Sequence, residues 1–169
     1  IQDLGKIVDI RHNNFTALEK VCLQTEVNLI LQSLNSFINS NDVSIETDFS
    51  WPQLVSIKAY VNSILFNLIS NAIQYRSPAR RPVIRISSRS IGDYIVLEIS
   101  DNGLGIDLLK YRSDLFKLYK RFHSHTPGKG LGLFIVKQQL EKLNAKIEVE
   151  SVPDQGTTFR IFHQVVLSK

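Results

Sequence analysis

The sequence predicts one α+β domain, and three observations carry this prediction. The segment that begins at Lys58 has the apolar spacing of a long amphipathic helix. The segments at 83–100 and 146–163 each have alternating apolar residues on both sides of a turn, which predicts two β-hairpins. Helices and hairpins that follow one another without a regular strand–helix–strand alternation are typical of α+β architecture.

Composition limits the domain count and the class of protein. With 169 residues, 43% of them hydrophobic, the chain can close one good-sized core. It has no run of 18 or more apolar residues and no basic segment leading into an apolar signal core, and its single cysteine, Cys22, excludes an internal disulfide framework. We therefore expect a cytoplasmic domain. The net charge of +4 is mild, and its arginines are not interleaved with aromatic residues, so we expect no nucleic-acid partner.

The first third of the chain predicts helices and short strands. Residues 1–13 have apolar side chains at helical spacing and predict the end of a helix. Residues 19–23 predict a short strand, after which Thr25 is the expected N-cap of a helix that runs to Ile38. Residues 43–49 alternate between apolar and polar side chains, which predicts a half-buried strand.

The predicted central helix, 58–75, has a polar edge that carries two amides. Its predicted buried stripe comprises Val61, Ile64, Leu65, Leu68, Ile69 and Ala72. Asn67 and Asn71 lie off that stripe and share one face, with Ser63 one turn earlier and Gln74 one turn later. Uncharged oxygen ligands suit a hard cation that phosphate oxygens already neutralise in part, as in nucleotide sites with magnesium. The alternative is that the asparagines only cap or solvate the helix.

The rest of the chain alternates predicted strands with loops. In order, we expect a turn at Pro52, strands at 83–89 and 94–100 joined through Gly92-Asp93, an excursion at 103–130 with at most short helical pieces, a helix around 133–143, and a hairpin of 146–152 with 157–163. Long loops inside compact domains usually carry function, so the excursion is a candidate binding region.

Asp101 follows the predicted strand 94–100 on its apolar side, by period-two counting. An ionised carboxylate that is buried without a partner costs several kcal/mol, roughly the scale on which such groups neutralise instead, so Asp101 needs hydrogen-bond donors. Gly103 and Gly105 let the next residues turn sharply and approach a ligand closely. An adenine amino group beside Asp101 would supply a donor. The alternative is a tight turn in which the carboxylate binds its own backbone.

A second glycine-rich segment, Gly128-Lys129-Gly130-Leu131-Gly132, leads directly into the last predicted helix. Glycines at a helix N-terminus expose free N–H groups and the positive end of the helix dipole, which together bind phosphate. The segment is not a Walker A loop, because no Lys and Ser or Thr follow its second glycine, and it is not a dinucleotide fingerprint, because no strand immediately precedes it. The alternative is a glycine-rich hinge without a ligand.

In this order, the motifs resemble the catalytic and ATP-binding domain of sensor histidine kinases, in the superfamily that includes gyrase, the ninety-kilodalton heat-shock chaperone and the MutL mismatch-repair proteins. The resemblance covers about residues 19–162. Residues 67–75 look like the N box, 101–105 the first glycine box, 115–121 the F box, 128–133 the second glycine box and 156–159 the closing strand signature. The resemblance implies a Bergerat-type fold, a two-layer α/β sandwich with a mixed β-sheet covered by helices on one face.

The resemblance also implies a role for each matched position. Asn71 resembles the magnesium ligand, with Asn67 assisting at the metal and phosphates. Asp101 resembles the carboxylate that recognises adenine, Tyr75 the ring that packs on the base, and Arg121 a basic residue near the terminal phosphates. Parts of the pocket and the phosphate cradle are matched by Gly103, Gly105, Ile106, Gly128, Gly130, Leu131 and Gly132. Many family members have lysine where this chain has Gln74, which removes a positive charge. Lys120, Arg121 and Lys129 are candidates to replace it.

The function implied is transfer of the ATP γ-phosphoryl group to a histidine on a dimerisation domain, for relay to an aspartate of a response regulator, with ATP and Mg²⁺ as cofactors. None of the four histidines matches the phosphoacceptor motif. We therefore expect residues 1–14 to be the remnant of the last helix of the dimerisation hairpin and residues 15–169 to be the catalytic domain. Such a fragment would be a monomer without autophosphorylation, and its parent protein a homodimer.

Two other functions stay open. One is an ATP-hydrolysing relative of the chaperones, which the asparagine at position 67 disfavours, because those relatives carry a hydrolytic glutamate there. The other is a degenerate nucleotide-binding or partner-binding module without kinase activity. Gln74 supports that hypothesis, and the intact glycines oppose it.

Overall fold

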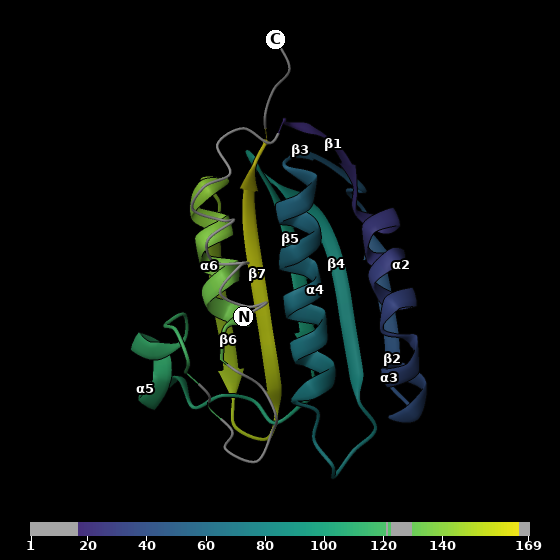
Figure 1. The fold of residues 1–169 in the computed structure, drawn as a ribbon, viewed down its shortest axis with the longest axis vertical. Helices are drawn as coiled ribbons and strands as arrows, with labels where there is room; N and C mark the ends of the chain where they lie inside the picture. The colour runs from purple at the N-terminus through teal and green to yellow at the C-terminus, as the bar shows by residue number, and fades with distance from the viewer. Residues whose placement is uncertain (1–16, 121, 123–129, 166–169) are drawn as a thin grey trace.

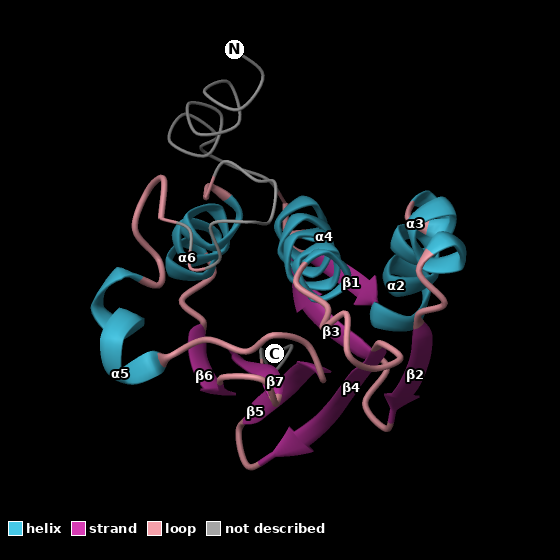
Figure 2. Cartoon of the chain, turned by 90° about the horizontal axis from the view of Figure 1, so that it is seen from below, coloured by secondary structure: helices cyan, strands magenta, loops and turns pink. Residues whose placement is uncertain are grey.

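The structure is a computed structural model that describes residues 17–120, 122 and 130–165, and its ribbon forms two layers (Figures 1 and 2). The elements in chain order are β1 (Glu19–Cys22), α2 (Leu23–Ser33), α3 (Asn35–Ser40), β2 (Ser44–Phe49), β3 (Gln53–Ser56), α4 (Lys58–Gln74), β4 (Val83–Ile91), β5 (Tyr94–Asp101), α5 (Leu108–Tyr111), a 3-10 turn (Arg112–Asp114), α6 (Gly132–Lys142), β6 (Lys146–Val152) and β7 (Gly156–Gln164). The main sheet has the order β2-β4-β5-β7-β6, in which β2 and β4 are parallel and the other neighbours antiparallel. Helices α2, α4 and α6 cover one face of it, as Figure 2 shows, so the predicted two-layer α+β sandwich is confirmed.

Helix α4 lies in the middle of the helical layer and supplies the centre of the core. All six residues of its predicted apolar stripe are buried. They pack in one cluster with the inward-facing side chains of the strands, among them Ile86, Ile99 and Phe159. This stripe faces the sheet. The polar edge of α4, which carries Asn67 and Asn71, lies beside the start of α6.

Both predicted hairpins are confirmed. Strands β4 and β5 join through Gly92-Asp93, and Gly92 has the left-handed φ of +56° that this tight turn requires. Strands β6 and β7 pair from Val152 and Gly156 outward, and Phe159 and Ile161 of β7 face the helices, as the alternation of apolar residues predicts. The turn of the second hairpin lies beside the end of β5, because Asp101 pairs with Thr157.

The predicted start and length of the helix from Thr25 to Ile38 are wrong. Helix α2 begins at Leu23 with Cys22 as N-cap, so Thr25 lies in its first turn. Leu23 is fully buried, and its N–H donates to the carbonyl oxygen of Pro52 at 2.8 Å, which makes the helix begin as soon as β1 ends. A break at Leu34 then separates α2 from α3. The hydroxyl of Ser33 donates to the Ile30 carbonyl, the kind of local contact that competes with helical bonding.

Strand β3 was not predicted, since the sequence there indicates only a turn at Pro52. It is four residues long and pairs with β1, more than 30 positions earlier in the chain, so no local pattern reveals it. Its last residue, Ser56, is fully buried and hydrogen-bonded to Nε2 of His163 on β7 at 3.1 Å. In the predicted strand 43–49, Thr47 is exposed, because β2 is an edge strand.

The division between residues 1–14 and 15–169 stays a prediction, because residues 1–16 lie outside those that the structure describes. In the part of the predicted excursion that the structure describes, residues 103–120, 122 and 130, there are two short helical pieces, α5 and the 3-10 turn that follows it, as expected. Within the described ranges, no helix has both the length and the apolar character needed to cross a membrane.

Candidate functional site

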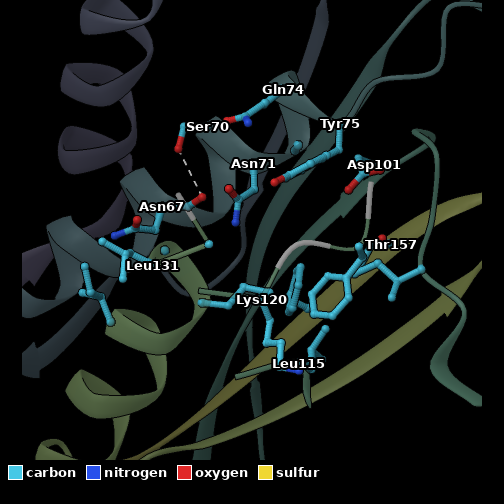
Figure 3. A pocket seen from close by; sticks show the side chains of 18 of the residues that line it. Asn67, Ser70, Asn71, Gln74, Tyr75, Asp101, Leu115, Lys120, Leu131 and Thr157 are labelled. Atoms are coloured by element: carbon cyan, nitrogen blue, oxygen red, sulfur yellow. Dashed lines mark hydrogen bonds between the residues drawn. The ribbon is translucent and has the colours of Figure 1, made fainter. Parts of the chain in front are cut away.

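A cavity of about 280 Å³ opens between the polar edge of α4, the start of α6, the end of β5, the start of β7, and the loop after Gly105 (Figure 3). The residues that line it and were expected at a site are Asn67, Asn71, Gln74, Tyr75, Asp101, Gly105, Ile106, Lys120, Gly130, Leu131 and Gly132. The first and last of these residues, Asn67 and Gly132, are 65 positions apart in sequence. The fold therefore brings the N-box and both glycine-box segments to one place.

The side chain of Asn67 is oriented by its own helix. Its Nδ2 donates to the carbonyl oxygen of Ser63 at 2.7 Å, which directs the amide oxygen away from that turn and toward α6. A Cβ built on Gly132 would lie 3.0 Å from Asn67 Oδ1 and 3.7 Å from Asn71 Nδ2. A glycine at position 132 is what lets the N-terminus of α6 come this close to both amides.

Asp101 lies at the end of β5 and faces the cavity beside Thr157, as Figure 3 shows. Its Oδ1 accepts a hydrogen bond from the N–H of Gly103 at 2.8 Å. Burial raises the pKa of the Asp101 carboxyl to about 6, although backbone hydrogen bonds from Gly103 and Thr157 act to lower it. Asp101 therefore binds the backbone of its own turn and also faces the cavity, so both alternatives considered from the sequence describe it. A further hydrogen-bond donor would still stabilise its ionised carboxylate.

The glycines after Asp101 are required by contacts between backbones. A Cβ on Gly103 would lie 2.4 Å from the carbonyl oxygen of Tyr75, and a Cβ on Gly105 would lie 2.0 Å from that of Val152. Gly105 also has a left-handed φ of +66°. Gly105 lines the cavity. Gly103 does not line it, and instead packs closely against the Tyr75 carbonyl at the end of α4.

The second glycine-rich segment meets the excursion loop in the same way. A Cβ on Gly130, which has a φ of +69°, would lie 2.5 Å from the carbonyl oxygen of Lys120. Leu131 is the N-cap of α6, and among the described residues no side chain caps that end. The first N–H groups of an α-helix have no partner within the helix, so this end of the cavity offers donors to an anion.

Lys120 provides a cation next to these donors. Its Nζ lies 3.1 Å from Oδ2 of Asp114, and Lys117 Nζ lies 2.7 Å from Oδ1 of the same residue. Hydrogen bonds from Lys117 and Lys120 lower the pKa of the Asp114 carboxyl. Arg121, Gly128 and Lys129, which were also expected at the site, lie outside the described residues.

The apolar wall of the cavity was mostly missed by sequence reasoning. Besides the expected residues, the cavity is lined by Ser70, Ala72, Leu115, Phe122, Leu133, Ile135, Thr157 and Phe159. Leu115, Leu133, Thr157 and Phe159 fall within the segments 115–121, 128–133 and 156–159 that the resemblance matched, although none of them was assigned to the site. Ile135 looks like an ordinary core position in the sequence, and only the packing places it at the cavity.

The cavity has two chemically different ends. At one end, a partly buried carboxylate lies among apolar side chains, an arrangement that accepts a hydrogen bond from the amino group of a flat heterocycle. At the other end lie two amide side chains, a helix N-terminus and a lysine, which suit an anion. No group of three or more His, Cys, Asp or Glu in the described ranges could hold a metal ion, so a cation there needs oxygens of the ligand as well.

We predict that Asp101→Asn stabilises the ligand-free domain at neutral pH. The folded-state pKa of Asp101 is about 6 against an ordinary 3.8, so its contribution to stability is complete below about pH 4 and is lost as the pH rises through 6. A rise of that size corresponds to roughly 3 kcal/mol as an upper bound. Urea unfolding at pH 4.5, 6 and 7.5 should therefore show a gain for the variant that grows with pH.

The matched control is Asp93→Asn, which makes the same change at an exposed residue in the β4–β5 turn. Its unfolding free energy should stay within about 0.5 kcal/mol of the wild-type value at each pH. A gain for Asp101→Asn that does not change between pH 4.5 and 7.5 would contradict the assignment of a buried, destabilised carboxylate.

Comparison with known proteins agrees with this arrangement. Residues 58–166 match the model of the family described as histidine kinase-, DNA gyrase B-, and HSP90-like ATPase. The chain is 33% identical over 122 residues to the non-motile and phage-resistance protein of Caulobacter vibrioides, across 68% of this chain and 14% of that protein. It is 27% identical over 165 residues to the histidine protein kinase SaeS of Staphylococcus epidermidis, across 94% of this chain and 47% of the kinase.

A solved structure shares the fold. The histidine kinase AdeS of Acinetobacter baumannii superposes with a TM-score of 0.78 at 22% identity, over 97% of this chain and 76% of that one. The chain spans less than half the length of either curated relative described above. The family match covers more than half of the chain, including α4, Asp101 and α6. The chain therefore belongs to the family of histidine kinase-, DNA gyrase B- and HSP90-like ATPases.

Proposed function

We propose that this chain is the ATP-binding domain that phosphorylates a histidine within a two-component sensor kinase, from which the phosphoryl group passes to an aspartate of a response regulator. The observation that carries the proposal is the position of Asp101. Its partly buried carboxylate faces the same cavity as Asn67, Asn71 and the N-terminus of α6. A base-binding end and a phosphate-binding end within one cavity suit a nucleoside triphosphate.

Adenine binds at the end of the cavity formed by β5 and the residue after α4. The Asp101 carboxylate accepts a hydrogen bond from the 6-amino group, a donor that the buried carboxylate gains from. Tyr75 packs on the base, and Ile106 and Phe159 complete an apolar surface around it. Guanine has a carbonyl oxygen at this position, which would face the carboxylate, so the site favours adenine over guanine.

The phosphates bind at the other end of the cavity. Gly130, Leu131 and Gly132 present the first N–H groups of α6, and the dipole of that helix favours negative charge. Lys120 adds a cation, and we assign Arg121 and Lys129 to the same end from their position in the sequence. Asn71 would hold Mg²⁺ through its amide oxygen, and Asn67 would assist it. When bound, Mg²⁺ neutralises charge that develops on the phosphoryl group.

The chain contributes to the transfer mainly by positioning. The bond between Asn67 Nδ2 and Ser63 holds one amide oxygen toward α6, and the glycine at 132 keeps the space beside it open. The helix N-terminus and Lys120 stabilise negative charge at the phosphates. The accepting histidine belongs to a dimerisation domain, so the fragment alone does not autophosphorylate. The chain by itself is a monomer, and the longer protein is a homodimer. Its partners are that dimerisation domain and the receiver domain of a response regulator, both in the cytoplasm.

Gln74 is the position that separates this proposal from an inert module. It lines the cavity where many family members have lysine, so the phosphate end has one positive charge fewer. Lys120 lies in the cavity wall and supplies a replacement charge. An asparagine at position 67 in place of a hydrolytic glutamate disfavours an ATP-hydrolysing chaperone-like role.

We predict that Asn71→Ala removes the magnesium dependence of nucleotide binding. In calorimetric titrations with a non-hydrolysable ATP analogue, the wild-type chain should bind more tightly with Mg²⁺ than without it. Asn71→Ala should lose roughly ten-fold in affinity with Mg²⁺, as for an interaction of about 1.4 kcal/mol, and little without it. The control Asn28→Ala removes an exposed amide from α2 and should leave both affinities unchanged. A wild-type chain that binds no nucleotide would favour the inert module.

We also predict that Gly132→Ala weakens binding of the phosphates without unfolding the domain. The added Cβ would lie 3.0 Å from Asn67 Oδ1, so that amide must shift from its present position. Alanine favours a helix over glycine, so the melting temperature should not fall. The affinity for the Mg-ATP analogue should decrease several-fold, while the affinity for adenosine, which lacks phosphates, stays at the wild-type value. An equal loss for both ligands would contradict the assignment of this end to phosphate.

A further inference from the structure

Arg80, in the loop between α4 and β4, joins three carbonyl groups from two other parts of the chain. Its Nε donates to the carbonyl oxygen of Asn102 at 2.7 Å, and its Nη2 donates to that of Gly103 at 3.3 Å and to that of Asp154. Asn102 and Gly103 directly follow Asp101, and Asp154 lies in the turn between β6 and β7. The side chain is exposed and does not line the cavity.

The loop that Arg80 holds is the one that positions Asp101. Leu104 N–H donates to the Tyr75 carbonyl at 2.9 Å, and Asp154 N–H donates to the Leu104 carbonyl at 2.7 Å. These bonds connect the loop to α4 on one side and to the hairpin turn on the other. The Gly103 N–H, in turn, is the donor that orients Asp101 Oδ1. The Asn102 carbonyl that Arg80 binds and the Gly103 N–H belong to the same planar peptide group, so Arg80 holds the group that fixes the carboxylate.

An arginine suits this position better than other cations. Three carbonyl oxygens from different segments converge on one side chain, and a planar guanidinium carries five N–H donors in a fixed fork. A lysine ammonium on a flexible stem does not match a fixed set of acceptors. The neighbouring Arg81 is different, because its side chain forms a surface pair with Asp42, at 3.0 Å between Nη2 and Oδ1.

We propose that Arg80 is a positioning residue for the adenine end of the site. Its fork holds the Asn102–Gly103 backbone against the β6–β7 turn, and so keeps Asp101 at the place where it meets the 6-amino group of the base. This inference rests on the proposed binding of ATP by the chain. It predicts a loss of base selectivity, not merely a loss of stability, when Arg80 is replaced.

The test compares ATP with ITP, in which the 6-amino group is replaced by a carbonyl oxygen. Affinities are measured with Mg²⁺ for the wild-type chain, Arg80→Ala, Asp101→Asn and the matched control Arg81→Ala. We expect Arg80→Ala to lose roughly five- to thirty-fold in ATP affinity, as for one or two hydrogen bonds worth about 1 kcal/mol each. ITP affinity and the ratio of affinities with and without Mg²⁺ should be unchanged, and Arg81→Ala should match the wild type in every value.

The double variant Arg80→Ala/Asp101→Asn provides the second comparison. Since Arg80 acts through Asp101, the double variant should bind ATP no more weakly than Asp101→Asn alone. If Arg80→Ala does not fold, Arg80→Lys is measured instead and should show the same loss of selectivity for ATP.

Three outcomes overturn the inference: equal losses for ATP and ITP, full selectivity in Arg80→Ala or in Arg80→Lys, or additive losses in the double variant. Each of these leaves ATP binding by the wild-type chain intact, so the proposed function stands. A wild-type chain that binds neither nucleotide overturns the proposed function itself, and the inference with it.

Discussion

The site depends on one unfavourable placement, a carboxylate at the end of a central strand with too little water and too few donors around it. Two backbone hydrogen bonds do not offset the burial of Asp101, and the pKa of its carboxyl rises to about 6. Asparagine or leucine would be easier to place there for stability alone. In the proposed function, a ligand that brings its own donor removes the penalty, so that binding energy and base selectivity would come from the same carboxylate. The ligand-free domain keeps this carboxyl group buried at a cost in stability, as functional sites often do.

Backbone contacts make this placement possible. Gly103, Gly105 and Gly156 are all positions where a side chain would overlap a carbonyl group of another segment. These contacts bring the end of α4, the loop after β5 and the β6–β7 turn into one unit around Asp101. At the other end of the cavity, Gly130 does the same for the excursion loop at Lys120, whereas Gly132 leaves room for the side chains of Asn67 and Asn71. Glycine thus serves less for flexibility here than for close approach of one backbone to another.

Patterns within short stretches of sequence predicted most of the elements. The apolar stripe of α4 and the two hairpins were correct because periodicity and turn residues decide them locally. Strand β3 and the start of α2 were missed or misplaced, since they depend on pairing with β1 and on the bond from Leu23 to Pro52. The roles of most motif residues of the site came from the resemblance of the motifs to a known family. Ile135 and Arg80 had no such signal, because their roles exist only once segments more than 20 positions apart lie side by side.

The most direct test is a crystal structure of the chain with Mg²⁺ and a non-hydrolysable ATP analogue. We expect the 6-amino group of adenine within hydrogen-bond distance of the Asp101 carboxylate, and the phosphates between Asn71 and the N-terminus of α6. Both ends of the cavity would then have the ligands that their chemistry suits. A base bound away from Asp101, or phosphates bound at the end of β5, would contradict the assignment of the two ends.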